Sequence, residues 1–176
     1  LLSTSFGPSS AVLLKLVTDI HPTIPVVWVD SGHNTESTYR LVDQLHTRLN
    51  LNLHIYHPRR SAAHRLAVLG ELPSIADSEH SRFPEEVKLE PFRRALVEHS
   101  PRYWISGVRA RDNKHRRAMG ISSQGPFNTT KIAPLYHWSD ENMESYMRDH
   151  NLPDVSNYFD PTKLVANREC GLHCKL

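Results

Sequence analysis

The chain alternates short apolar segments with longer amphipathic ones, and this alternation constrains its fold more than any other feature. The apolar segments have the length of β-strands, and the amphipathic segments repeat apolar residues at helical spacing. Strands are predicted at residues 1–5, 24–30, 51–56, 102–107 and 131–135. Helices are predicted at residues 10–20, 35–49, 61–69, 85–99 and 139–150, with Asn34 or Thr35 available to cap the second. This order predicts an α/β domain built on a mostly parallel, twisted sheet with helices on both faces.

A chain of 176 residues is long enough for one domain with a substantial core and too short for two. The regular pattern stops after Leu152, and a polar stretch follows it. We therefore expect an α/β domain over residues 1–152 and a mobile C-terminal tail over residues 153–176. Because the chain opens directly on what reads as a core strand, we also expect an N-terminal segment to precede Leu1.

Composition narrows the class of protein. Hydrophobic residues make up 39% and charged residues 23% of the chain, which is typical of globular rather than disordered proteins. The longest apolar run, residues 24–29, is too short to span a membrane, and the opening residues lack the regions of a signal peptide. A net charge of +2 is too small to indicate nucleic-acid binding. The expectation is a cytoplasmic protein that binds neither membranes nor nucleic acid.

Small and hydroxyl-bearing residues dominate the turn between the first strand and the first helix. They are Ser3, Thr4, Ser5, Phe6, Gly7, Pro8, Ser9 and Ser10. Converging backbone N–H groups at a helix N-terminus bind anions, although the Gly-Lys-Ser/Thr ending of a Walker A loop is absent here. A serine-rich turn also caps helices for structural reasons, so this motif alone leaves both roles open.

The sequence Asp30-Ser31-Gly32 follows the second predicted strand. Ligands of open α/β sheets gather at the carboxyl ends of the strands, so this turn would lie beside the serine-rich one and could meet a ribose or an adenine edge. The same three residue types are also preferred in ordinary turns.

Basic residues are concentrated after the fourth predicted strand, at Arg109, Arg111, Lys114, His115, Arg116 and Arg117. Guanidinium groups match the oxygens of phosphate and sulfate, so the cluster would clamp a polyanion at the same edge of the sheet. A solvated surface is the alternative.

Both cysteines, Cys170 and Cys174, lie at the end of the chain. One terminal pair makes neither a disulfide framework nor a usual zinc site. Arg168, His173 and Lys175 flank Cys170 and would favour its reactive thiolate. The pair therefore indicates nucleophilic or redox chemistry, with chance placement as the alternative.

Several segments together resemble the 3′-phosphoadenylyl-sulfate (PAPS) reductase family. They are Ser-Thr-Ser-Phe-Gly at 3–7, Val-Asp-Ser-Gly at 29–32, Lys-Leu-Glu-Pro-Phe-Arg-Arg-Ala-Leu at 88–96, Trp-Ile-Ser-Gly-Val-Arg at 104–109 and Arg-Glu-Cys-Gly-Leu-His at 168–173. Each is modest alone, and the terminal Glu-Cys-Gly-Leu-His run is the most diagnostic. The segments occur in the family's order and extend from residue 1 to residue 173.

The resemblance implies an adenine nucleotide alpha-hydrolase-like fold with a modified pyrophosphatase (PP) loop at residues 5–10. In the family, a terminal cysteine attacks the sulfate sulfur of PAPS, adenosine 3′,5′-bisphosphate leaves, and a cysteine S-sulfonate remains. Thioredoxin or glutaredoxin then releases sulfite, as a step of assimilatory sulfate reduction. Carried onto this chain, Cys170 is the nucleophile. The substrate-binding candidates are Ser3, Thr4, Ser5, Phe6, Gly7, Asp30, Ser31, Gly32, Arg109, Arg111, Arg116, Arg168 and His173.

The resemblance also bears on cofactors and partners. Related adenylyl-sulfate (APS) reductases hold an iron–sulfur cluster on cysteine pairs, the first of which comes shortly before the Lys-x-Glu-Pro segment. In this chain the corresponding positions are near Phe83 and Pro84, and no cysteine stands there. The ligand count therefore predicts no cluster and favours PAPS, with a cluster-free APS reductase as the alternative. A homodimer is an expectation of the family.

The chain departs from the family pattern in three places. The stretch between the last helix and Cys170 is short, and Ala110 stands where a second arginine is usual. The third departure is the second cysteine, Cys174. It either resolves the S-sulfonate on Cys170, forms a disulfide with Cys170 in the resting enzyme, or has no role in the reaction.

Two other functions compete with the reductase. A PP-loop adenylyl or sulfur transferase would use the same scaffold with Mg²⁺, but Ser9 replaces the acidic residue of that loop. A catalytically silent nucleotide-binding protein is the third alternative, and in it Cys170 would be dispensable.

Overall fold

The computed structural model describes residues 1–73 and 82–162. The strands are β1 (Leu2–Thr4), β2 (Pro25–Val29), β3 (Asn52–Tyr56), β4 (Tyr103–Ile105), β5 (Ser122–Gln124) and β6 (Thr130–Ile132). The α-helices are α1 (Ser10–Ile20), α2 (Glu36–Leu49), α3 (Ala62–Leu69), α4 (Glu90–His99), α5 (Lys114–Arg117) and α6 (Asp140–Asp149). A π-helix, η2 (Glu85–Leu89), leads directly into α4.

The strands form one sheet in the order β3-β2-β1-β4-β6-β5. All neighbours are parallel except β5 and β6, which form an antiparallel edge. Leu2 pairs with Val26 on one side and with Ile105 on the other, so β1 lies in the middle of the sheet. The predicted α/β fold with a mostly parallel sheet is confirmed.

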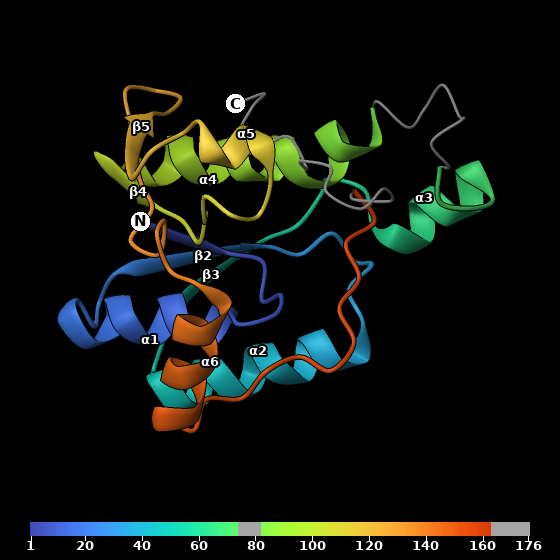
Figure 1. Cartoon of the computed structure of the whole chain (residues 1–176). Coiled ribbons are helices and arrows are strands. Elements are labelled where there is room, and N and C mark those ends of the chain that lie inside the picture. Colours follow the sequence, from blue (N-terminus) through green and yellow to red (C-terminus); the bar gives the residue numbers. More distant parts are fainter. Residues whose placement is uncertain (74–81, 163–176) are drawn as a thin grey trace.

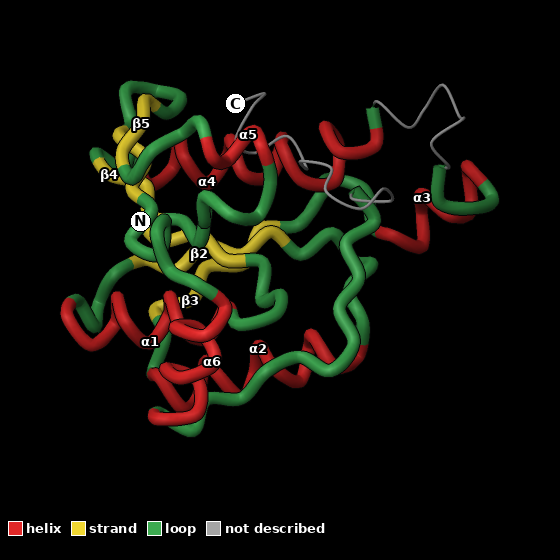
Figure 2. Tube along the Cα trace, viewed as in Figure 1, coloured by secondary structure: helices red, strands yellow, loops and turns green. Residues whose placement is uncertain are grey.

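Helices cover both faces of this sheet, as Figures 1 and 2 show. Helices α1, α2 and α6 lie on one side, where Leu14, Val26 and Leu45 are fully buried. Helix α4 covers the other side and packs Phe92 and its neighbours against Trp104. Both faces are therefore apolar, as a parallel sheet between two helical layers requires.

Caps account for several helix boundaries. The Thr35 side chain accepts the Thr38 N–H at the start of α2, and Ser139 forms a reciprocal capping box with Asn142 at the start of α6. Of the two capping candidates for the second helix, Thr35 is therefore the one used.

The predicted helix at residues 85–99 exists, but its first turn is widened into η2. Pro91 has no N–H to donate to the carbonyl four residues earlier, and its ring crowds that carbonyl. Here the Glu90 N–H bonds instead to the Glu85 carbonyl, five residues back. The proline thus explains a π-turn that the periodicity did not predict.

The segment between β4 and β6 also differs from the prediction. It holds the short helix α5 and the edge strand β5, neither of which was predicted, and β6 ends earlier than the predicted 131–135 strand. Elements of three or four residues are too short to produce a periodic pattern. Within residues 1–73 and 82–162, no helix is both long and apolar enough to cross a membrane.

The connections place a switch point beside β1. From β1 the chain moves to β2 and β3 on one side, and β4 then lies on the other side of β1. The loops that leave the carboxyl ends of β1 and β4 therefore diverge to opposite faces, which opens a crevice between them. Ligand sites of open α/β sheets lie at such points.

Candidate functional site

A pocket of about 360 Å³ occupies this crevice. Its wall comes from the β1–α1 loop, the ends of β2 and β4, the π-helix η2 and residues 158–162. Ser3, Thr4, Ser5 and Gly7 all line it, as predicted from the sequence. The serine-rich turn and the basic segment after β4 therefore meet in one cavity.

The β1–α1 loop presents polar groups to the pocket. The Thr4 hydroxyl accepts the Phe6 N–H, and the Gly7 carbonyl accepts the Ser10 N–H, which holds the turn compact. The buried Ser10 Oγ has no hydrogen-bond partner within the described parts of the chain, although it lines the pocket. A buried hydroxyl without a partner is costly, so this group is suited to contact a ligand.

Phe6 was predicted to line the nucleotide site, but the structure places it in the core. Its side chain is fully buried and packs edge-on against Trp28, with ring centroids 5.4 Å apart. The residue has a left-handed φ of 49°, which turns the backbone so that the ring points inward while Ser5 and Gly7 face the pocket. Phe6 therefore shapes the loop rather than lining the cavity.

In the turn after β2, too, only some of the residues face the pocket. Ser31 and Asn34 line the pocket, whereas Asp30 and Gly32 lie outside its lining. The buried Asp30 Oδ1 accepts hydrogen bonds from the Gly32 N–H (2.9 Å), the Asn34 amide (2.8 Å) and the Tyr39 hydroxyl (3.0 Å). The carboxylate thus organises the turn instead of presenting itself to a ligand.

Gly32 serves the packing of the same turn. Its φ is +78°, and a β-carbon there would lie 3.0 Å from the Ala62 β-carbon. A left-handed backbone that closely approaches α3 explains the glycine.

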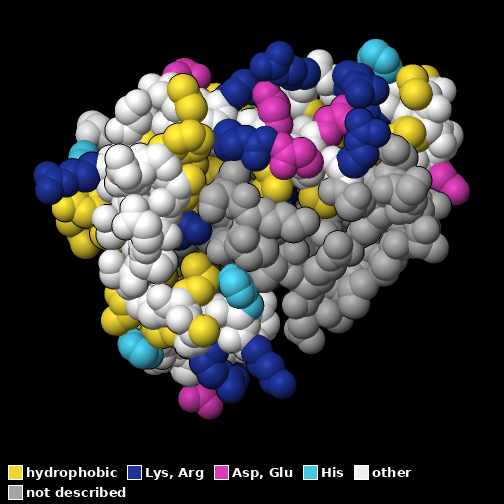
Figure 3. All heavy atoms as spheres, turned by 90° about the horizontal axis from the view of Figure 1, so that it is seen from above, with side chains coloured by type: hydrophobic (Ala, Val, Ile, Leu, Met, Phe, Trp, Pro, Cys, Tyr) yellow, Lys and Arg dark blue, Asp and Glu magenta, His cyan; other side chains and the backbone are white. Residues whose placement is uncertain are grey.

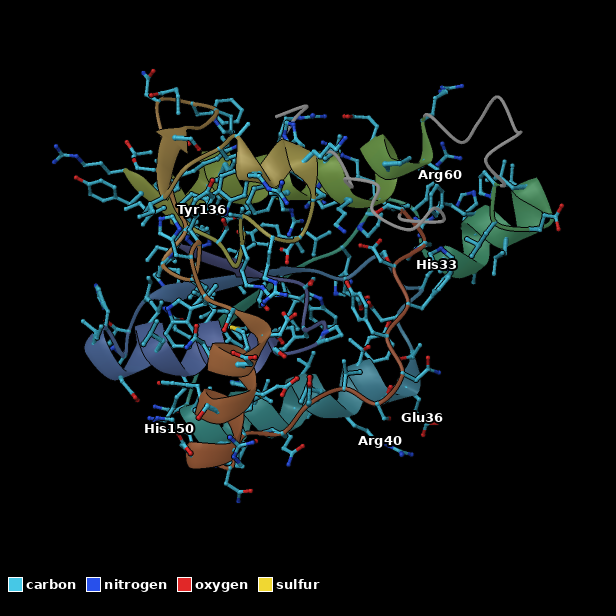
Figure 4. All side chains as sticks on the ribbon, viewed as in Figure 1. His33, Glu36, Arg40, Arg60, Tyr136 and His150 are labelled. Carbon is cyan, nitrogen blue, oxygen red and sulfur yellow. The ribbon has the colours of Figure 1, made fainter. Side chains whose placement is uncertain are left out.

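A buried arginine, Arg65 of α3, forms hydrogen bonds to this turn. Its guanidinium donates to the Ser31 carbonyl at 2.7 Å and to the Arg60 carbonyl, and one nitrogen lies 3.2 Å from His33 Nε2. Figure 4 shows His33 and Arg60 on the same side of the molecule, beside α3. Desolvation, with a further contribution from the Arg65 charge, lowers the pKa of His33, so the imidazole is held neutral beside the arginine.

The arginines after β4 separate into two groups. Arg109 and Arg116 line the pocket, and both pair with Asp112, at 3.2 Å and 2.7 Å respectively. Arg111 lies outside the lining and pairs with Asp140 at 2.9 Å, and the same carboxylate also receives Arg109 at 2.8 Å. Of the predicted polyanion clamp, Arg109 and Arg116 are therefore the arginines that face the pocket, and Asp112 and Asp140 hold them there.

The basic helix α5 is attached to the sheet by Tyr136, whose hydroxyl donates to the Arg117 carbonyl at 2.7 Å (Figure 4). On the α4 and α5 side, basic and acidic side chains lie next to one another (Figure 3). Ion pairs also join Arg94 to Glu90 at 2.9 Å and Arg60 to Glu86 at 3.3 Å. These pairs compensate part of the surface charge, and they lie outside the basic segment at residues 109–117 to which the solvated-surface alternative applies.

Lys88 was quoted in a family motif but not predicted as a site residue, yet η2 brings it to the pocket wall. Its ammonium lies 2.5 Å from Asp160 Oδ2, and the two side chains are 13% and 7% exposed. Burial alone would raise the pKa of Asp160, but the Lys88 charge and the hydrogen bonds from Lys88 and Thr162 outweigh burial and lower it. The sequence did carry a signal for Lys88: it stands three residues before Pro91, and this proline widens the helical turn that carries the lysine to the pocket.

Tyr158, also missed in the sequence, lies against the β1–α1 loop. A β-carbon on Gly7 would be 3.1 Å from Tyr158 Cζ, so the glycine admits the ring. The described part of the predicted tail therefore contributes to the pocket wall. The remaining predicted residues of the tail, Arg168, Cys170, His173 and Cys174, lie outside the described residues.

Comparison with known proteins agrees with this architecture. The family model of the phosphoadenosine phosphosulfate reductase domain matches residues 1–161. The phosphoadenosine 5′-phosphosulfate reductase of Synechocystis sp. is 34% identical over 200 aligned positions, covering 99% of this chain and 80% of the relative. The enzyme of the same name from Synechococcus sp. is 38% identical, covering 98% of this chain and 84% of the relative.

Solved structures share the fold at lower sequence identity. The crystal structure of PAPS reductase from Candida auris, a phosphate complex, has a TM-score of 0.74 and 24% identity, covering 88% of this chain and 74% of that one. FMN adenylyltransferase from Candida glabrata, in complex with ATP, has a TM-score of 0.60 and 17% identity, covering 88% and 47%. The scaffold is therefore shared with adenylyl transferases, whereas the sequence relatives are reductases. The chain belongs to the phosphoadenosine phosphosulfate reductase family, as its motifs predicted.

Proposed function

We propose that this chain reduces PAPS to sulfite and adenosine 3′,5′-bisphosphate, with Cys170 as the nucleophile. The observation that carries the proposal is the pocket at the β1–β4 switch point, which joins the serine-rich loop to Lys88, Arg109 and Arg116. Hydroxyls, backbone N–H groups and three cations suit a ligand with several phosphate-type groups. The terminal Glu-Cys-Gly-Leu-His sequence supplies the thiol.

The roles of the described residues follow from their positions. Ser5, Gly7 and Ser10 line the loop at the start of α1, where backbone N–H groups and the helix dipole favour a phosphate. Arg109 and Arg116 approach from the β4 side and would bind the second anionic group. The apolar part of the wall, which includes Val27, Val29 and Phe92, would pack against the adenine.

The reaction is the transfer of a sulfo group to a thiol, followed by thiol exchange. The Cys170 thiolate attacks the sulfate sulfur, a sulfur–sulfur bond forms, and the bond from that sulfur to the bridging phosphate oxygen breaks. Adenosine 3′,5′-bisphosphate leaves with the bonding electrons, and a Cys170 S-sulfonate remains. A thiol of thioredoxin or glutaredoxin then attacks the Cys170 sulfur, sulfite leaves, and the second thiol of the donor closes its disulfide. The donor dithiol supplies the two electrons.

The proposed substrate is PAPS rather than APS. The related APS reductases hold an iron–sulfur cluster on two cysteine pairs, whereas the cysteines of this chain are Cys170 and Cys174 alone. The proposal therefore includes no tightly bound cofactor.

Intact-protein mass spectrometry tests the mechanism directly. Reduced protein is mixed with PAPS, and separately with APS, in the absence of thioredoxin. We expect PAPS to add the mass of one SO₃ group, which peptide mapping assigns to Cys170, and thioredoxin to remove it with release of sulfite. The Cys170→Ser variant should bind adenosine 3′,5′-bisphosphate normally and acquire no adduct. If binding occurs but neither nucleotide leaves an adduct or releases sulfite, or if turnover requires Mg²⁺, the reductase assignment is wrong.

A further inference from the structure

Residues 154–162, which we call the strap, run across the carboxyl edge of the sheet from beyond α6 toward η2 (Figure 1). Polar contacts attach the strap to three elements of the fold. The Asp154 carboxylate accepts the Ser9 N–H at 2.8 Å, and the Asn157 carbonyl accepts the hydroxyls of Thr35 (2.6 Å) and Ser37 (2.7 Å). The strap thus spans the start of α1, the start of α2 and, through Asp160, the π-helix.

The Asp160 attachment differs from the other two because it is buried and ionic. One carboxylate oxygen receives the Lys88 ammonium at 2.5 Å, and the other accepts the Thr162 N–H at 3.0 Å and its hydroxyl at 2.6 Å. Thr162 is 1% exposed. Both carboxylate oxygens are therefore engaged, and a buried charge is tolerated only in such an arrangement.

The pair also lies in the wall of the pocket. Lys88, Asp160 and Thr162 all line the cavity, so the contact that fixes the strap also fixes a cation beside the ligand. Along the chain, Cys170 comes ten positions after Asp160.

We infer that Asp160 is a positioning residue, which holds the Lys88 ammonium at the pocket wall and fixes the strap from which the chain continues to Cys170. The inference rests on the proposed function, because it concerns the step in which Cys170 meets the nucleotide. Misplacement of a reacting group by about 1 Å slows a reaction by roughly 100-fold, whereas nucleotide binding also draws on the β1–α1 loop, Arg109 and Arg116.

The test compares Asp160→Asn with Asp19→Asn. Asp19 also pairs with a lysine, Lys15, but on the exposed surface of α1 outside the pocket lining. Two quantities are measured for each protein: the Kd of adenosine 3′,5′-bisphosphate and the single-turnover rate of S-sulfonate formation from saturating PAPS. For Asp160→Asn we expect the rate to fall roughly 10- to 100-fold and the Kd to change by less than about 3-fold. Asp19→Asn should match the wild type in both.

Two further variants guard against a general loss of structure. Thr162→Val removes the hydroxyl bound to Asp160 and keeps the backbone N–H, so it should slow adduct formation in the same direction but less. Asp160→Glu retains the charge and should recover part of the rate. An unchanged rate in Asp160→Asn overturns the inference, as does a Kd that rises by the same factor as the rate falls. If the wild type forms no adduct, the proposed function fails first, and the inference fails with it.

Discussion

The ring of Tyr158 packs directly against Gly7: a β-carbon there would lie 3.1 Å from Cζ and 3.3 Å from Cε1 of the ring, which is tighter than an ordinary contact, so the ring would have to move by a few tenths of an ångström. The contact joins the PP-like loop to the strap, two segments from opposite ends of the chain. The loop and the strap therefore form one wall of the pocket.

Gly7→Ala should consequently weaken nucleotide binding. The added methyl group must displace the Tyr158 ring or shift the β1–α1 loop, at a cost of about 1–3 kcal/mol in the free energy of unfolding, and a shift of this pocket-lining loop should raise the Kd of adenosine 3′,5′-bisphosphate. Urea unfolding and calorimetric titration measure the two effects.

Gly107→Ala is the matched control for stability. Residue 107 also lines the pocket, but a β-carbon there would meet Leu13 at 3.7 Å, which is an ordinary contact. Equal destabilisation by the two substitutions would contradict the importance of the Gly7–Tyr158 contact.

The two arginine groups predict different binding losses. Arg116→Ala removes a guanidinium that lines the pocket, and loss of a charge-assisted hydrogen bond should raise the Kd of adenosine 3′,5′-bisphosphate roughly 10- to 100-fold. Arg111→Ala removes one that pairs with Asp140 outside the lining, so its Kd should change by less than about 3-fold. Calorimetric titrations of both variants at the same ionic strength measure the two Kd values. A larger rise in Kd for Arg111→Ala than for Arg116→Ala would contradict the assignment of Arg116 to the anion site.

Arg65 should matter for stability and for binding together. Arg65→Met would leave the Ser31 and Arg60 carbonyls without their buried donor, at about 1–3 kcal/mol for a buried unsatisfied group. Because Ser31 lines the pocket, the Kd of the nucleotide should rise as well. Arg40→Met is the control, since Arg40 and Glu36 point outward from α2 (Figure 4) and form an exposed pair. Wild-type binding by a folded Arg65→Met protein would count against this role.

The lowered pKa of Asp160 predicts an acid-sensitive contribution to stability. A carboxyl group with a folded-state pKa below its unfolded value of about 3.9 stabilises the fold above that value. The contribution is lost as the pH falls through the folded-state pKa. The difference in unfolding free energy between wild type and Asp160→Asn should therefore be constant from pH 5 to 7 and shrink below about pH 4. Urea titrations across this range measure it, and a difference that grows on acidification would refute the assignment.

The role of Cys174 in resolving the Cys170 S-sulfonate can be tested by substitution. If it resolves the Cys170 S-sulfonate, Cys174→Ser should accumulate the adduct, whereas wild type should release sulfite and form an internal disulfide without thioredoxin. Mass spectrometry and a count of free thiols distinguish these outcomes. Identical adduct lifetimes in the two proteins would mean that Cys174 is incidental.

The amino-acid sequence by itself determined the α/β class, most helices and strands, and the family. Periodicity within 10 to 15 residues reports local burial, so α1, β2, α2 and α6 were predictable. The serine-rich turn and the arginines after β4 could be placed together because carboxyl ends of parallel strands share one edge. The family motif, rather than any pattern of burial, is the basis on which Cys170 is proposed as the nucleophile.

Only the tertiary structure decided which of these side chains face the pocket. Phe6 and Asp30 belong to the predicted turns, yet one ring fills the core and one carboxylate binds its own loop, because a turn's backbone angles and not its composition direct each side chain. Lys88 and Asp160 are 72 positions apart, and no local pattern signals that a proline-widened helix and a polar strap will meet. Burial of that pair is a property of the packed chain, and it gives the pocket a wall that the sequence did not reveal.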